Sequence, residues 1–392
     1  MNRVKFKRQN GGLARLVAGE DHISGLLIYG KADIDKSSIN APEELEEKGI
    51  TLDSDPALMY HVNEFYRQNP GAKLYFQCIE DSDGEYTEVK VLQNYAGGSI
   101  RQMGVINYKV DATDVSAMVA NLDQVCKDLR DLNTPISLVC SMNMTASELI
   151  SLVDLHDLDA ENVSVVIGQD AGGLGNYLST ENNSIGMVGS VLGVMSKAKV
   201  NESIGWIEKF DLISTAYSKK LTNDVQVSRE LDVLGFIDGS KLEDYTPLQI
   251  QSLIDKGYIF AIKETGQTGS YCNDSFTATD LESDYAYIEN NRTTDKALRL
   301  VNKVLTPKIQ SPAYVDPDTG YLDPSTVASL EALADDELDQ MKRDGEISGY
   351  SVYINPDQAV LRNSKLEVVI MIVPTGTLRE ITVKLGLTLQ IS

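Results

Sequence analysis

The end of the chain, residues 381–391, constrains the fold more than any other segment. Apolar residues alternate there with polar or small ones, and the alternation runs without a break. This pattern predicts a β-strand with one apolar face, about 36 Å long at ~3.3 Å per residue. A strand of that length aggregates readily when unpaired, so the pattern calls for a partner strand. The apolar positions are Ile381, Val383, Leu385, Leu387, Leu389 and Ile391.

The beginning of the chain shows a shorter strand pattern with basic character. Val4 and Phe6 alternate with three basic residues. Residues 1–19 carry +5, so the other 373 residues carry −28 in a chain of net charge −23. We expect a basic arm that lies on an acidic surface. The alternative is a solvated, mobile terminus. No apolar run follows the basic residues, so we expect no secretory signal.

Two ways of pairing these terminal strands stay open. Each strand can close the sheet of its own domain, which is the ordinary arrangement. The strands can instead be exchanged between subunits, and the 40 or so loosely patterned residues after the basic arm favour this arrangement. Each exchanged main-chain hydrogen bond contributes ~1 kcal/mol net. Two arms per subunit would multiply that contribution by avidity in a lattice.

Composition narrows the class of protein. Apolar residues make up 42% and charged residues 24%, as in ordinary globular proteins. The charge of −23 argues against a diffuse binder of nucleic acid or anionic membrane. The sequence contains no run of 18 consecutive apolar residues, so we expect no membrane span. The four cysteines form no CxxC pair, so we expect buried, reduced thiols.

The middle of the chain alternates helices and strands, which predicts an α/β fold with a parallel sheet. Apolar residues recur at three- and four-residue steps over 113–131, and short apolar strands follow at 136–140 and 163–167. Before them, residues 73–79 and 88–92 are interpreted as the two strands of a hairpin. Residues 11–50 show few periodic apolar positions.

The last hundred residues predict two helices and two strands. Helices are expected over 293–305 and over 324–344, where Asp323 is the N-cap and Pro324 the first helical residue. Residues 368–373 are all apolar, which predicts a central strand buried on both faces. A turn at 374–376 leads into the terminal strand.

No motif predicts an active site, a metal site or a cofactor. The sequence has three histidines, no HExxH, no Gly-x-Ser-x-Gly and no GxxxxGK[ST]. Residues 168–175, GQDAGGLG, follow a strand but lack the lysine and the spacing of a phosphate loop. Residues 316–323 are similar to the start of a calcium loop, but position 12 would be Val327 instead of glutamate, so we interpret them as a turn before the helix cap. Close helix packing explains Gly186, Gly189 and Gly193 better than a cofactor does.

Several segments, in this order, resemble contractile tail sheath proteins. The resemblance extends to a branch of that superfamily in phages and prophages that is often named only as a domain of unknown function. It covers most of the chain and is weakest over 26–180. The segments that carry it are 11–25, 184–210, 266–274, 283–285, 291–299, 345–350, 372–376 and 381–387.

The resemblance implies a structural protein without enzymatic activity or cofactor. It implies a tail-sheath-like core with a central sheet flanked by helices and with extended terminal strand arms. Its subunits would polymerise as stacked hexameric rings around an inner tube and contract to drive the tube through a target cell envelope. The implied partners are the subunit itself, the tail tube protein, and baseplate and tail terminator proteins, with no nucleic acid and no direct membrane insertion. The implied location is the virion tail, assembled in the bacterial host cytoplasm, or the cytoplasm if the chain is part of a domesticated injection system.

The resemblance also suggests a division of the chain and a set of contact residues. The divisions are an N-terminal arm (1–25), a variable β-rich outer region (26–110), an α/β sheath domain (111–262), a C-terminal core domain (263–376) and a C-terminal arm (377–392). Lys342 and Arg343 mark a helix that would face the tube. The expected strand-exchange residues are Val4, Phe6, Ile381, Val383, Leu385, Leu387 and Leu389.

Two other classes remain open on the sequence alone. One is a different self-assembling tail or baseplate component that uses the same strand exchange, although a tube protein would be shorter and mostly β. The other is an α/β enzyme or ligand-binding protein whose terminal strands close its own sheet. The Gly168–Gly175 loop would then be the first place to look for a ligand.

Overall fold

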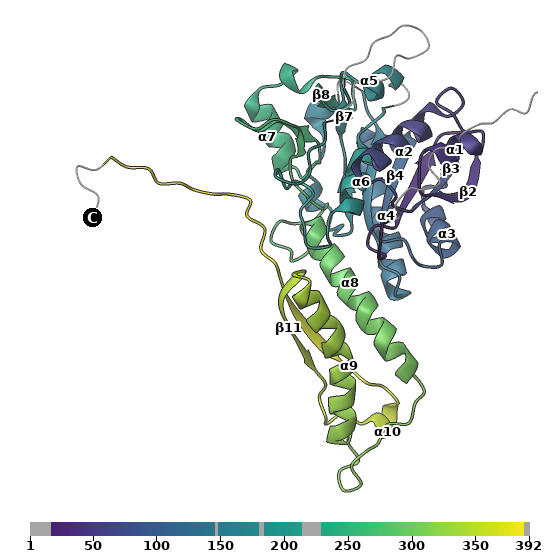
Figure 1. Ribbon diagram of the computed structural model, residues 1–392, viewed down its shortest axis with the longest axis vertical. Helices are drawn as coiled ribbons and strands as arrows, with labels where there is room; N and C mark the ends of the chain where they lie inside the picture. Colours follow the sequence, from purple (N-terminus) through teal and green to yellow (C-terminus); the bar gives the residue numbers. More distant parts are fainter. Residues whose placement is uncertain (1–16, 146–147, 180–183, 214–228, 388–392) are drawn as a thin grey trace, which may run out of the picture.

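Six strands from residues 24–165 form the central sheet of an α/β body (Figure 1). The computed structural model describes residues 17–145, 148–179, 184–213 and 229–387. The sheet order is β2-β3-β1-β4-β5-β6, and all neighbours are parallel except β2, which is antiparallel to β3. The expected central sheet is therefore confirmed. Its strands are β1 (Ser24–Tyr29), β2 (Ile34–Ile39), β3 (Leu74–Ile79), β4 (Gln102–Asp111), β5 (Ser137–Asn143) and β6 (Val163–Val165).

Strand β1 lies in the interior of this sheet, although the sequence patterns did not predict it. All six of its residues are buried. A strand covered on both faces reads as a continuous apolar run, here Leu26–Tyr29, and so shows no alternation. Strands from the predicted outer region, 26–110, also share one sheet with β5 and β6. The predicted boundary at 110/111 therefore does not separate two sheets.

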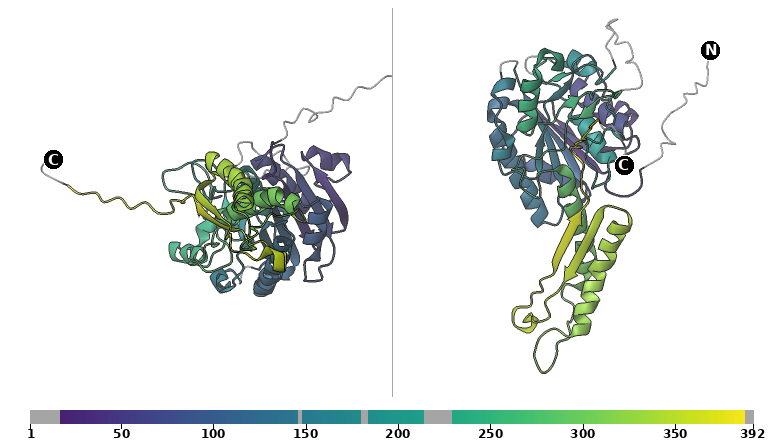
Figure 2. Two further views of the ribbon diagram at one scale, coloured as in Figure 1. Left: turned by 90° about the horizontal axis from the view of Figure 1, so that it is seen from below. Right: turned by 90° about the vertical axis from the view of Figure 1, so that its left-hand side faces the viewer.

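Helices cover both faces of the sheet (Figure 2). Helices α2 (Pro56–Gln68) and α6 (Val188–Lys197) cover one face, where they pack on Leu26 and Ile28 of β1. Helices α3 (Thr87–Tyr95) and α4 (Val115–Asp131) cover the other face, where Leu27 and Tyr29 point. Consecutive side chains of β1 thus serve two separate cores, as the pleat of a strand requires. The predicted helix over 113–131 is confirmed as α4.

The region 87–95 corrects the predicted hairpin, because it forms helix α3 instead of a return strand over 88–92. Val89 and Leu92 are buried against the sheet, and Val91 between them is 43% exposed. This spacing of three residues is helical, but two buried apolar positions are too few to distinguish a short helix from a short strand. The turn before α3 is built by Asp83, whose carboxylate accepts hydrogen bonds from the backbone N–H of Glu85 and Tyr86.

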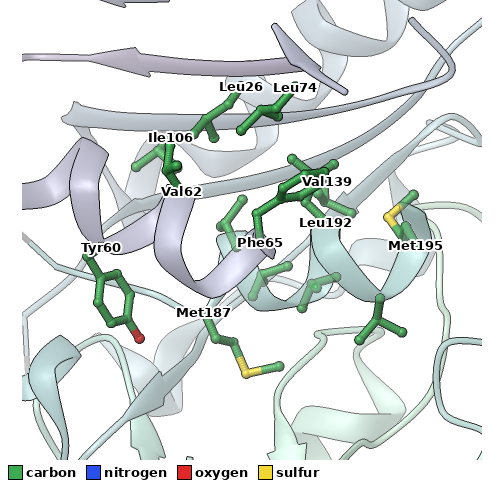
Figure 3. Close-up of a cluster of buried hydrophobic side chains, with 14 of the residues drawn as sticks. Leu26, Tyr60, Val62, Phe65, Leu74, Ile106, Val139, Met187, Leu192 and Met195 are labelled. Atoms are coloured by element: carbon green, nitrogen blue, oxygen red, sulfur yellow. The ribbon is translucent and has the colours of Figure 1, made fainter. Parts of the chain in front are cut away.

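Helices α2 and α6 approach each other closely enough to exclude side chains at two positions. A Cβ atom at Gly189 would lie 2.4 Å from the carbonyl oxygen of His61, and one at Gly193 would lie 2.7 Å from that of Phe65. These glycines therefore serve close helix packing, as expected. Figure 3 shows the core beside this contact, where Val62 and Phe65 of α2 and Leu192 of α6 meet side chains of the sheet.

Shorter elements complete the body. They include two small antiparallel sheets, β7 with β8 and β9 with β10. The bounds are α1 (Glu43–Glu47), α5 (Leu174–Leu178), α7 (Pro247–Asp255), β7 (Gly168–Asp170), β8 (Leu234–Phe236), β9 (Ala261–Ile262) and β10 (Tyr271–Cys272).

A long extension leaves the body along helix α8 (Ile288–Leu305), as Figures 1 and 2 show. Helix α9 (Pro324–Arg343) packs back along α8 and begins as predicted, since the Asp323 carboxylate accepts a hydrogen bond from the backbone N–H of Ser325. The extension has its own small core, which includes Ala297, Leu338 and Met341. Its remaining elements are β11 (Ile347–Tyr353), α10 (Val360–Asn363) and β12 (Val369–Pro374).

Strand β12 corrects the prediction of a central strand over 368–373. It pairs with β11 in a two-stranded antiparallel sheet. Ile370 and Ile372 face the core of the extension. Val369, Met371 and Val373 face away from it and are 42%, 64% and 58% exposed. The strand is apolar on both faces, but the described residues cover only one of them.

A partly buried charge network links the extension to the body. The Lys296 ammonium on α8 lies 2.7 Å from the carboxylate of Asp21 and 2.6 Å from that of Glu346. The Arg299 guanidinium lies 3.3 Å from Asp21. Arg292 is buried and donates hydrogen bonds to the backbone carbonyls after α6. The two buried members, Arg292 and Glu346, would be left without these partners if α8 turned, so the network disfavours reorientation of α8.

Candidate assembly interface

Residues 375–387 leave the junction of body and extension as an extended segment (Figure 1, yellow). This segment has no strand assignment, so the single chain does not form the predicted terminal strand within the described residues. Ile381, Val383, Leu385 and Leu387 are 74%, 79%, 94% and 105% exposed. The other predicted strand-exchange residues, Val4, Phe6 and Leu389, lie outside the described residues.

The exposed apolar side chains of this segment would contribute a large favourable free energy if another surface buried them. Burying one Val, Leu or Ile side chain contributes about 1.5–3 kcal/mol. The four described positions therefore offer roughly 6–12 kcal/mol to a surface that covers them, before the cost of ordering the segment. Alternation places all four on one face of an extended chain, so a single apolar surface can cover them together.

The two-stranded sheet of the extension offers matching features. In the described part of the chain, β11 and β12 each pair only with the other, so each keeps one edge with free backbone N–H and C=O groups. Tyr353 pairs with Val369 and is 53% exposed on the same outer face as Met371 and Val373. An open edge beside an apolar face is the arrangement to which an extended peptide adds as a further strand.

The predicted tube-facing residues lie at the end of α9. Lys342 and Arg343 are both exposed in the last turn, where positive charge is favourable next to the helix C-terminus. The Arg343 guanidinium forms an ion pair with Asp339 one turn earlier. Both side chains lie at the surface, with the charge of Arg343 paired to Asp339, and their contact with a tube remains a prediction.

The glycine-rich segment 168–175 begins as strand β7, and side chains of the chain itself fill the turn that follows. The Asp170 carboxylate accepts hydrogen bonds from the backbone N–H of Gly173 and Leu231. A Cβ atom at Gly173 would lie 2.0 Å from that carboxylate, and one at Gly175 would lie 2.8 Å from the hydroxyl of Tyr60. A buried aspartate occupies the amides that a phosphate would need, so the geometry gives a nucleotide site no support here.

Asp170 makes the stability of the body depend on pH. Burial, followed by the nearby carboxylate of Glu64, raises the pKa of Asp170 to about 7 from an ordinary value of 3.8. The folded state therefore binds a proton between these pH values that the unfolded state releases. Stability falls as pH rises through this range, by up to about 4 kcal/mol from this group.

We expect Asp170→Asn to weaken this pH dependence, because the amide keeps the acceptor oxygen and removes the buried charge. Urea unfolding followed by circular dichroism at pH 5, 6, 7 and 8 measures the effect. The exposed Asp53→Asn variant is the matched control, since it changes the net charge equally. If the unfolding free energy changed with pH equally in Asp170→Asn and in wild type, the raised pKa of Asp170 would be contradicted.

Other candidate sites have structural roles. The Asp316 carboxylate accepts hydrogen bonds from the backbone N–H of Asp318 and Thr319, which makes the expected turn. Among the described residues, no cluster of His, Cys, Asp or Glu has the geometry to hold a metal ion. No helix in the described ranges has the length and apolar character that a membrane crossing requires. The four cysteines are buried and unpaired, namely Cys78, Cys126, Cys140 and Cys272.

The body, the extension and the terminal segment share their fold with solved chains of contractile injection systems and of a tail sheath. Similar solved structures include a chain of the anti-feeding prophage (AFP) baseplate, with a TM-score of 0.64 and 15% identity over 98% of both chains. A chain of the contracted PVC sheath complex, from an extracellular contractile injection system, matches with a TM-score of 0.60 and 11% identity. The match covers 99% of this chain and 98% of that one. The sheath tail protein Lin1278 from Listeria innocua matches with a TM-score of 0.50 and 12% identity, over 92% of this chain and 96% of that one.

The chain belongs to the DUF2586 family. The model of the DUF2586 N-terminal domain matches residues 1–276, and that of the C-terminal domain matches residues 284–392. No curated protein matches the sequence. The resemblance to tail sheath proteins is confirmed for the fold, at identities that leave the details of assembly to be derived from this chain.

Proposed function

We propose that this chain is the sheath subunit of a contractile phage tail or of a related injection particle. The tail sheath fold supports a structural role in such a particle. The observation that carries the proposal is the terminal segment, which exposes four alternating apolar side chains beside a sheet with open edges. A chain that works alone has no use for this surface, whereas a polymer buries it at every contact.

In the proposed assembly, neighbouring subunits complete one another's sheets. The C-terminal arm, through Ile381, Val383, Leu385, Leu387 and Leu389, adds as a strand to the β11–β12 sheet of a neighbour. The basic N-terminal arm adds a further strand through Val4 and Phe6, and its charge favours an acidic partner surface. Each strand contributes several main-chain hydrogen bonds at ~1 kcal/mol net, and two arms per subunit connect the subunits into a mesh.

The proposed product is a stack of hexameric rings around an inner tube. Its extended form stores free energy, and triggered contraction repacks the rigid bodies while the exchanged strands keep them connected. Such work needs neither cofactor nor covalent chemistry, so we propose no enzymatic activity. Lys342 and Arg343 on α9 are proposed to face the tube, and baseplate and terminator proteins to bind the ends of the sheath. The proposed location is the virion tail, assembled in the host cytoplasm.

Negative-stain electron microscopy of the purified protein, alone and co-expressed with a candidate tube protein, tests the proposal. We expect striated hollow cylinders or stacked six-fold rings. A uniform 43.0 kDa monomer at high concentration, with no polymer even beside the tube protein, would overturn it.

Deletion of residues 1–10 tests the N-terminal arm separately. We expect the truncated chain to lose polymerisation and to keep its fold, because the described residues, from Val17 onward, already form extensive cores in the body and the extension. Circular dichroism checks the fold, and sedimentation velocity checks the polymer. A truncated chain that assembles as wild type does would remove the N-terminal arm from the proposed mechanism.

A further inference from the structure

The root of the C-terminal arm is tied to the body at one arginine. The Arg379 guanidinium lies 2.7 Å from the carboxylate of Glu289 and 3.1 Å from that of Asp274. It also donates a hydrogen bond of 3.1 Å to the hydroxyl of Ser275. The same group stacks on the ring of Tyr287, 3.4 Å from the ring centroid. Four side chains at the junction of body and extension thus converge on one side chain of the arm.

The surroundings of Arg379 make this contact stronger than a surface ion pair. The Glu289 side chain is 3% exposed, that of Asp274 is 17% exposed, and that of Arg379 is 28% exposed. Burial alone lowers the pKa of Arg379, but the carboxylates of Asp274 and Glu289 raise it above its usual range. The guanidinium is planar, so two carboxylates and a ring fix its orientation as well as its position.

The contacts of the root follow the alternation of an extended chain. The Thr375 hydroxyl accepts a hydrogen bond from the Asn201 side chain, and the Thr377 hydroxyl donates one to Glu289. Leu378, which points away from these contacts, is 84% exposed. Residues 375, 377 and 379 therefore dock on the body with one face of the segment. The apolar residues 381, 383, 385 and 387 continue with the same parity.

We propose that Arg379 is a positioning residue that fixes where the C-terminal arm leaves the body and which way its apolar face points. Beyond it, every residue from Glu380 to Leu387 is exposed, so Arg379 is the last anchored position of the described arm. A strand turned by one residue presents its polar face to the partner, so the orientation of the arm decides whether it can pair. This inference rests on the proposed strand exchange.

We call the contacts of Arg379 with Asp274, Ser275, Tyr287 and Glu289 the clamp. Spin-label distances in the unassembled chain test this clamp without any polymer. Nitroxide labels on Ser252→Cys in α7 and Lys384→Cys in the arm report the spread of arm positions, and the four native cysteines are buried. We expect a narrow distance distribution with Arg379 present and one at least twice as wide in Arg379→Ala. Arg379→Lys keeps the charge but not the planar fork, so we expect an intermediate width.

Two further variants keep the test decisive. Asp274→Asn weakens the clamp from the body side and should also widen the distribution, even if Arg379→Ala fails to fold. Arg362→Ala, which removes an exposed arginine of the extension, should leave the width unchanged. Widths equal to that of wild type in Arg379→Lys and Asp274→Asn would overturn the clamp.

Polymer length, measured on the same clamp variants without labels, separates this inference from the proposed function. Shortened polymers in Arg379→Ala, with a widened arm distribution, support the positioning role. Normal polymers despite a widened distribution would overturn that role and leave the strand exchange intact. Failure of the wild type itself to polymerise would instead count against the proposed function, while the measured widths still decide whether the arm is clamped.

Discussion

Leu385→Lys abolishes polymerisation and leaves the subunit folded: this is the result we expect for the arm. Leu385 is 94% exposed in the single chain, so the substitution disturbs no contact of the folded subunit. In the proposed polymer the same side chain is buried against a neighbour. The variant then loses about 2 kcal/mol of apolar burial and adds an unpaired charge to the interface. Together these effects weaken each contact by roughly 100-fold or more.

Sedimentation velocity and electron microscopy of the variant measure this effect directly. Thr382→Lys is the matched control, because it places the same charge on the opposite face of the same arm. We expect Thr382→Lys to form polymers close to wild-type length. Polymers of normal length from Leu385→Lys, or equal loss in both variants, would show that the predicted apolar face is not the buried one.

The elements that the sequence predicted well are those with a long period and a clear cap. Helix α4 repeats its apolar positions over five turns, and α9 combines Asp323, Pro324 and a basic last turn. The sequence also predicts the role of Gly189 and Gly193 in α6, because small residues at helical spacing usually allow two helices to pack closely. In each case local sequence and tertiary structure favour the same conformation.

The elements that it missed are defined by tertiary context. Strand β1 has no period because both of its faces are buried, and α3 has only two buried apolar positions to reveal its period. Strand β12 is apolar on both faces, which predicted a central position, yet the described part of the chain covers only one face. That mismatch is itself informative, since an exposed apolar face of this kind favours contact with another molecule.

The candidate interface was predictable only where its pattern is local in the sequence. The alternation of residues 381–391 is local, so the arm is visible in the sequence. The clamp at its root is not, because Arg379 lies 105 residues from Asp274 and 90 from Glu289 along the chain. A single arginine before an apolar alternation carries no signal until the fold brings those carboxylates to it.

The body itself should be most sensitive at the contact between α2 and α6, where Gly189→Val is expected to destabilise the fold by about 3 kcal/mol or more. Even the Cβ atom of a larger residue would lie 2.4 Å from the backbone oxygen and 2.8 Å from the Cα atom of His61. A backbone cannot move aside as a flexible side chain can. The two helices must therefore separate, and the core between them and the sheet loses its packing.

Urea unfolding followed by circular dichroism measures this loss of stability, and soluble yield gives a first indication. Gly349→Val in β11 is the matched control, because a Cβ atom there would meet nothing nearer than 3.9 Å and valine favours strands. We expect the control to unfold within about 0.5 kcal/mol of wild type. An unchanged midpoint for Gly189→Val would mean that α2 and α6 do not cross as closely as their glycines imply. The layer that covers one face of the central sheet would then be held by side-chain contacts alone.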